Sequence, residues 1–228
     1  MVEQDISQWT IMYSLTPTNL PAAARAYHAL EKMIVTLELP PRSVTTEGAL
    51  IRMLGLGRTP VREAIQRLSW EGLVEIRPRA GLAIADLNAS DWLKVLDARR
   101  GLEVALARSA ARFVTADLAV QFRQAALRMQ KATVAGNAMA FLEADREVDE
   151  TMALASDNPH AARAAAPLQT HSRRFWYRFK ADSGLAPAAE QHIHVIQAIL
   201  DGDEREAAKA ADQLVTFLRK NAEAAARI

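Results

Sequence analysis

Two aspartates and one histidine fall on apolar helix faces, where polar side chains are costly unless a partner satisfies them. Asp145 and Asp149 lie one turn apart in a predicted helix over residues 138–156, in the middle of its apolar stripe. That stripe consists of Ala138, Phe141, Leu142, Val148 and Met152. His192 lies on the apolar face of a later helix, whereas His194 points away. Buried carboxylates need a cation, an arginine or a polar ligand, so we expect these three side chains to converge on one polar site.

The positive partner of these aspartates can be a metal ion or an arginine. Aspartate oxygens and a neutral imidazole suit several divalent ions, for example zinc or nickel, which makes Asp145, Asp149 and His192 candidate ligands. The competing interpretation is a metal-free pocket in which Arg99 or Arg100 supplies the charge. A lone inward histidine is also compatible with a hydrogen-bonded core residue.

A second group of charged side chains gathers near the start of the chain. Between positions 52 and 79 there are six arginines against three glutamates, although the net charge of the whole chain is only +1. A predicted helix over residues 58–71 buries an apolar face and presents Arg58, Thr59 and Arg62 on the other side. Guanidinium groups placed in this way can bind phosphates or guanine edges. The alternative is a solvated charged face on a small helical domain.

The elements around this helix complete a recognisable unit. Helices are predicted over residues 22–37 and 46–54, the second with Thr46 as its N-cap and with an inward face made of Ala49, Leu50, Met53 and Leu54. From residue 73 the apolar period becomes two, which indicates a hairpin with its turn at RPRAG. Arg77 and Arg79 at the tip can reach a minor groove or the backbone, and Gly81 allows close approach. Three helices followed by a hairpin make a winged helix-turn-helix, here over residues 21–85.

The remaining residues divide into an N-terminal extension over 1–20 and a helical domain over 90–228. Helix start signals occur at Ser90, Thr115 and Asn137, and the helical pattern breaks at Asn158-Pro159, Ser183-Gly184 and Gly202. The fold class predicted for the chain is therefore mainly α, with an N-terminal winged helix-turn-helix followed by an all-helical antiparallel bundle. The bundle is too large to be a dimerisation tag, and its apolar stripes indicate a packed core.

Composition excludes several kinds of function. The chain has no cysteine, which rules out disulfides, thiolate zinc sites and cysteine nucleophiles. No apolar run approaches the roughly 18 residues of a membrane span, and the start MVEQDISQWT lacks the features of a signal peptide. We therefore expect a cytoplasmic protein with no membrane partner.

The segment GLGRTPVREAIQRLSWEGLVEIRPRAG resembles the DNA-binding domain of the GntR family of bacterial transcription regulators. The resemblance covers about residues 22–85 and implies a dimer that binds double-stranded operator DNA. By position, the family's DNA contacts correspond to Arg58, Thr59 and Arg62 in the helix and to Gly81 with its neighbours in the wing. Gly48 stands where the family carries an arginine, so one backbone contact is either missing or supplied by Arg52.

The later segments FLEADREVDETMALASDNPHA and HIHVIQAILDGD are similar to the FCD-type effector-binding domain of the FadR subfamily. This resemblance implies a divalent metal held by one aspartate and three histidines, which helps to bind a small carboxylate effector. Asp145 and His192 match two of the ligands, and Asp149 occupies a histidine position. Leu214 falls at the last histidine position and removes a ligand.

The segment DARRGLE resembles the family's V-R-x-x-L-E segment, whose arginine often faces the effector. Arg99 matches that arginine, and Arg100 projects nearer the apolar stripe. Either one can instead pair with Glu103 in a structural role.

Together these features predict a homodimeric transcription regulator that binds an inverted repeat and responds to a small carboxylate metabolite. The alternative is a metal-dependent enzyme domain tethered to a DNA-binding domain. It needs an open coordination position and a separate general base, a role for which no residue stands out. An architectural DNA protein would leave the buried aspartates unexplained.

Overall fold

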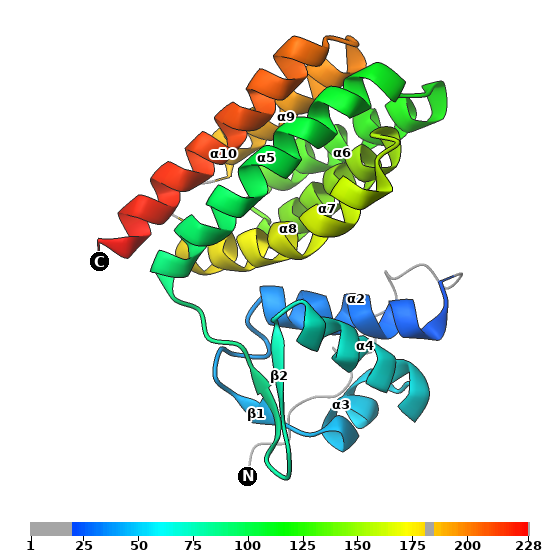
Figure 1. The fold of residues 1–228 in the computed structure, drawn as a ribbon, viewed down its shortest axis with the longest axis vertical. Coiled ribbons are helices and arrows are strands. Elements are labelled where there is room, and N and C mark those ends of the chain that lie inside the picture. The colour runs from blue at the N-terminus through cyan, green and yellow to red at the C-terminus, as the bar shows by residue number, and fades with distance from the viewer. Residues whose placement is uncertain (1–19, 181–184, 228) are drawn as a thin grey trace. The chain divides into compact units, whose positions relative to one another are not determined.

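The computed structural model describes residues 20–180 and 185–227 (Figure 1). It divides the chain into two compact units, Met1–Asp86 and Leu87–Ile228. The predicted extension over residues 1–20 lies outside the described residues except for its last position, and so does the helix break predicted at Ser183 and Gly184.

The first unit consists of three helices and a small antiparallel sheet (Figure 1). The helices are α2 (Ala22–Val35), α3 (Glu47–Leu54) and α4 (Arg58–Trp70). The strands are β1 (Val44–Thr45), β2 (Val74–Arg77) and β3 (Gly81–Ile84), in the order β1-β3-β2. The three helices and the hairpin share one apolar core, which includes Leu30, Ile34, Leu50, Val61, Leu68 and Leu82. The predicted winged helix-turn-helix is confirmed, whereas β1, with only two residues, is too short to give a periodic signal.

Local side-chain chemistry explains where α3 and α4 begin and end. The hydroxyl of Thr46 accepts a hydrogen bond from the backbone N–H of Ala49 at 3.2 Å, as expected of an N-cap. Gly55 ends α3 in the left-handed conformation, with φ of 62°. The prediction that Met53 faces inward is wrong, because its side chain is 44% exposed. The predicted alternation in β3 is also wrong, since Leu82, Ala83 and Ile84 are all buried in this central strand.

Gly81 opens β3 at a position that excludes a side chain. Its φ is +96°, and a Cβ there would lie 2.5 Å from the carbonyl oxygen of Thr45 in β1. Gly81→Ala is therefore expected to lower the free energy of unfolding of this unit by about 1–3 kcal/mol. Gly48→Ala is the matched control, because its added Cβ would meet Arg52 at 3.6 Å, an ordinary contact. Urea unfolding followed by circular dichroism would measure both, and equal stability of the two variants would contradict this reading of the wing.

The second unit is a bundle of long helices (Figure 1). They are α5 (Ala89–Phe113), α6 (Ala116–Val134), α7 (Ala138–Ala155), α8 (Pro159–Phe179), α9 (Ala186–Leu200) and α10 (Glu204–Ala226). Thr115 and Asn137 cap α6 and α7 as predicted, whereas α5 begins after Asn88 rather than at Ser90. Helix α5 packs along both α10 and α8, and α6 packs along α7. No helix in the described part of the chain is long and apolar enough to span a membrane.

Candidate functional site

Helix α4 buries one face in the first unit and exposes the other. Val61, Ala64, Ile65 and Leu68 are buried, as the apolar spacing predicts. Arg58, Thr59 and Arg62 are exposed. Because α4 follows the short α3–α4 connection, its N-terminal half is the part that a helix-turn-helix presents to a major groove.

Helix α3 contributes one contact to this exposed face and carries a further guanidinium of its own. The Nε atom of Arg62 donates a hydrogen bond to Glu47 at 2.7 Å, which leaves the two terminal nitrogens of that guanidinium available to DNA. The Nη1 atom of Arg52 lies 3.6 Å from the place where a Cβ on Gly48 would be. Arg52 thus brings a guanidinium to the neighbourhood of position 48, where the GntR resemblance expects an arginine.

Arg67 has a structural role on another part of α4. Its guanidinium lies 3.6 Å from the ring centroid of Tyr27 and pairs with Glu71 at 2.9 Å. The hydroxyl of Tyr27 donates to the same glutamate at 2.7 Å. This cluster joins the C-terminal end of α4 to α2, so Arg67 does not belong to the candidate DNA-binding face.

The wing carries its two arginines on either side of Pro78. Arg77 is exposed and pairs with Glu75 at 2.7 Å, and its pKa is raised by that hydrogen bond and by the carboxylate charge. Arg79 is exposed in the turn, with a left-handed φ of 63°. Gly81 pairs with Arg77 across the hairpin, so it shapes the wing through its backbone.

The wing arginines are expected to act through phosphate. Arg77→Ala or Arg79→Ala should then weaken binding to all DNA sequences and reduce the slope of log affinity against log salt by about one. Fluorescence anisotropy over a salt series, on specific and on scrambled duplexes, measures both quantities. Loss of preference at one base pair with an unchanged slope would instead assign these residues to base recognition.

The bundle of the second unit brings Asp145, Asp149 and His192 together, with two arginines between and beside them. His192 on α9 places its Nε2 atom 3.2 Å from Oδ1 of Asp145 on α7. Arg173 on α8 lies 2.5 Å from Asp149 and 3.5 Å from Asp145 through the same nitrogen, Nη1. Arg99 on α5 hydrogen-bonds Glu103 at 2.8 Å and lies 3.7 Å from Asp149. All of these side chains are buried, so they form one polar network inside an apolar bundle.

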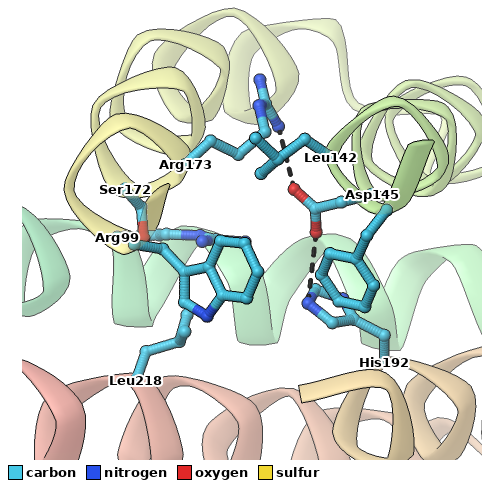
Figure 2. Close-up of a pocket in the computed structure, with 9 residues that line it drawn as sticks. Arg99, Leu142, Asp145, Ser172, Arg173, His192 and Leu218 are labelled. Carbon is cyan, nitrogen blue, oxygen red and sulfur yellow. Dashed lines mark ion pairs between the residues drawn. The ribbon is translucent and has the colours of Figure 1, made fainter. Parts of the chain in front are cut away.

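A small cavity opens beside this network (Figure 2). Its lining combines polar side chains with the apolar groups of Phe141, Leu142, Trp176 and Leu218. The polar lining residues are Arg99, Asp145, Ser172, Arg173 and His192. Figure 2 shows Asp145 between Arg173 and His192, with both ion pairs drawn. The side chain of Arg99 reaches the cavity from another direction.

One nitrogen of the cavity-lining residue Arg99 is left without a hydrogen bond. The Nη2 atom of Arg99 is buried and hydrogen-bonds to no described residue, since its distance of 3.7 Å from Asp149 is too long. A buried guanidinium nitrogen without an acceptor is costly. Arg99 therefore keeps a strong donor for an anionic or carbonyl oxygen that reaches it.

Arg100, the other arginine predicted for the effector site, is absent from the cavity lining. It donates to Thr216 at 2.9 Å and pairs with Asp212 at 3.0 Å, and both partners lie on α10. Adjacent residues on a helix differ in direction by about 100°, so only one of the two arginines can face the network.

Burial sets the protonation of this network. Burial lowers the pKa of His192, with the charge of Asp145 opposing that shift, so burial favours the neutral imidazole beside Asp145. Burial and the charge of Asp145 raise the pKa of Asp149 well above its ordinary range, while the two guanidinium groups oppose the shift. Burial also works against the charge of Arg99, but Glu103 and Asp149 hold its pKa above the ordinary value.

The predicted metal ligands do not fit a metal ion in this arrangement. Ligand atoms around a divalent ion converge on a shared point at about 2.0–2.6 Å. Here His192 contacts Asp145 directly, and the carboxylate of Asp149 is directed at the guanidinium of Arg173. Within residues 20–180 and 185–227, no group of three or more histidines, aspartates or glutamates is placed to hold a metal.

Two residues that line the cavity, Arg173 and Ser172, were not predicted from the sequence. Both line the cavity together with Trp176, which is three residues beyond Arg173 and on the same side of α8. Projection of the segment THSRRFWYRF on a helix would have placed an arginine beside a tryptophan on an inward face. That signal is weaker than two carboxylates on an apolar stripe, because arginines next to aromatic residues are also common at surfaces.

Known families match both units. Residues 22–84 match the bacterial regulatory proteins of the gntR family, and residues 94–217 match the FCD domain. A relative from Agrobacterium vitis, an uncharacterized HTH-type transcriptional regulator in the TAR-I ttuE-ttuC' intergenic region, is 34% identical over 56% of this chain and 76% of its own length. The "Probable D-xylose utilization operon transcriptional repressor" of Paenarthrobacter nicotinovorans is 27% identical over 83% of this chain and 82% of its own length.

Solved structures share the fold at low sequence identity. Escherichia coli McbR/YncC superposes with a TM-score of 0.72 at 16% identity, covering 88% of this chain and 98% of that chain. A GntR transcriptional regulator from Rhodococcus sp. RHA1 gives a TM-score of 0.62 at 20% identity, covering 89% and 96%. The winged unit, the helical unit and the family matches agree: this chain belongs to the GntR family of bacterial transcription regulators, with an FCD domain as its helical half.

Proposed function

We propose that this DNA-binding regulator changes its affinity for operator DNA when a small carboxylate binds beside Arg99. The observation that carries the proposal is Arg99, which lines the cavity and whose buried Nη2 atom hydrogen-bonds to no described residue. A carboxylate oxygen is the strongest acceptor that a guanidinium can take. The neighbouring hydroxyl of Ser172 adds a second polar group to the same wall.

The size of the cavity indicates how binding can be coupled to movement. The volume open to the centres of water molecules is about 20 Å³, room for about one or two waters. A metabolite therefore needs the lining side chains to shift, which makes the liganded bundle a different conformation. A ligand that prefers that conformation shifts the population towards it, and this is the linkage on which the proposed regulation depends.

The proposed DNA complex is a homodimer on an inverted repeat. A twofold dimer presents two copies of α4 to two half-sites, one helical turn or a multiple apart. Selection of bound duplexes from a random DNA pool tests this directly. We expect enrichment of an inverted repeat, and enrichment of a single unrepeated site would contradict the dimeric arrangement.

The ligand proposal is tested by calorimetry with acetate, lactate, succinate and citrate as probes. We expect at least one of them to bind the wild type and to bind Arg99→Lys at least about tenfold more weakly, because lysine lacks the planar fork. Arg108→Lys, an exposed position on the same helix, is the control and should bind like wild type. Turnover of a bound acid would favour the alternative of an enzyme tethered to DNA. Equal binding by Arg99→Lys would reject Arg99 as the contact.

A further inference from the structure

The carboxylates of α7 already have a cation in the place where the FCD resemblance expects a metal ion. Through Nη1, Arg173 contacts Asp149 at 2.5 Å and Asp145 at 3.5 Å, and all three side chains are at most 8% exposed. We infer that Arg173 takes the place of the divalent ion, so that this regulator's effector site works without a metal. The ligand part of this inference rests on the proposed function, and the metal part does not.

Electrostatics supports the exchange of a metal for an arginine. A guanidinium keeps its charge at any pH that the protein experiences, and it satisfies two carboxylates through several N–H groups. A divalent ion at the same carboxylates would lie within a few ångströms of that fixed positive charge. Their repulsion in a buried site opposes metal binding. Arg173 would have to leave before a metal could enter.

The sequence departs from the metal-binding pattern in the same direction. Asp149 replaces a histidine ligand, and the replacement supplies the carboxylate that Arg173 contacts most closely. Leu214 replaces another ligand and is buried on α10. The ligand position at 149 thus holds a partner for arginine, and the ligand position at 214 holds a residue of the apolar core. These changes fit a site that has exchanged its metal for a guanidinium.

Without a metal, the effector must be bound by hydrogen bonds alone. Arg99 offers Nη2, and the Ser172 hydroxyl accepts from the indole N–H of Trp92 at 3.4 Å, which leaves its own proton to donate. This pair of donors suits one carboxylate group. A metal site, by contrast, would bind more tightly those ligands that chelate the ion through a second oxygen. The inferred ligand class is therefore a small carboxylate whose affinity does not depend on chelation.

Metal analysis of the full chain, purified without chelator and without a nickel column, tests the inference. We expect far less than one zinc or nickel ion per wild-type chain, and a melting temperature that EDTA, zinc chloride and nickel chloride leave unchanged. Arg173→Met removes the guanidinium from Asp145, Asp149 and His192, so this variant should gain stabilisation by zinc or nickel. Asp145→Asn in the same background should abolish that gain. Arg173→Lys keeps the charge and should remain metal-free.

About one metal ion per wild-type chain, lost in Asp145→Asn, would overturn the inference, and so would a folded Arg173→Met that gains no response to metal. If Arg173→Met does not fold, the metal content and EDTA response of the wild type decide the question. Both measurements use protein without effector or DNA. A failed search for a carboxylate ligand therefore leaves them unaffected, and a metal-loaded wild type that still binds carboxylates would overturn this inference alone.

Discussion

Arg173→Met is expected to lower the free energy of unfolding of the helical unit by about 3–5 kcal/mol, the cost of removing one partner from a buried ion pair. The variant leaves Asp145 and Asp149 close together in an apolar bundle without the guanidinium that contacts both. Methionine fills much of the volume of arginine, so the loss of stability comes from the missing charge more than from lost packing. Arg173 holds the pKa of Asp149 down, so that pKa should rise further in the variant, and the stability loss should be smaller at about pH 5 than at about pH 8.

Urea unfolding followed by tryptophan fluorescence measures this loss, because Trp92 and Trp176 are both buried in the helical unit. Lys94→Met is the control, since it removes one positive charge from an ion pair with Asp91 at the surface. The lysine side chain of that pair is 77% exposed. Such pairs contribute little to stability. A stability loss in Arg173→Met no larger than in Lys94→Met would show that the buried network is not held by Arg173.

Arg58→Ala is expected to weaken binding to the selected operator roughly 5- to 150-fold, the range for loss of one good contact to a base edge. Arg58 is exposed at the first position of α4, the end of a recognition helix that enters the groove. Arg62→Ala should weaken binding to the operator by a factor in the same range. The Nε atom of Arg62 is engaged by Glu47, so its remaining nitrogens are held in one direction.

Anisotropy with the selected duplex and with a scrambled one separates base recognition from general attraction to DNA. Arg123→Ala removes the same charge from an exposed position on α6 and should bind like wild type. If Arg58→Ala and Arg62→Ala both bind like Arg123→Ala, α4 is not the helix that reads the operator.

Local signals in the sequence were sufficient to predict most of the fold. The sequence predicts Thr46 as an N-cap and predicts helix starts at Thr115 and Asn137, and each of these side chains accepts a hydrogen bond from an N–H group in the first turn of its helix. The apolar spacing of α4 and α7 correctly gave their buried faces. The exposure of Met53 and the pairing of β1 with β3 were not predictable in this way, because tertiary contacts decide them.

The sequence predicts only part of the candidate site. Projection on a helix placed Asp145, Asp149 and His192 inward, and that placement does not depend on neighbouring helices. Which cation meets the aspartates is decided by how α8 packs against α7, and helix periodicity carries no information about that. The choice between Arg99 and Arg100 likewise depended on the rotation of α5, which only the packed bundle defines.

Effector control of DNA binding is tested most directly by the affinity for the selected operator with and without each carboxylate probe. We expect at least one probe to change the wild-type Kd by roughly 5- to 150-fold, the usual range of allosteric coupling, and to leave the Kd of Arg99→Lys unchanged. Arg108→Lys should respond like wild type. If a probe binds the wild type in calorimetry but leaves its operator affinity unchanged, or changes Arg99→Lys equally, the account is contradicted.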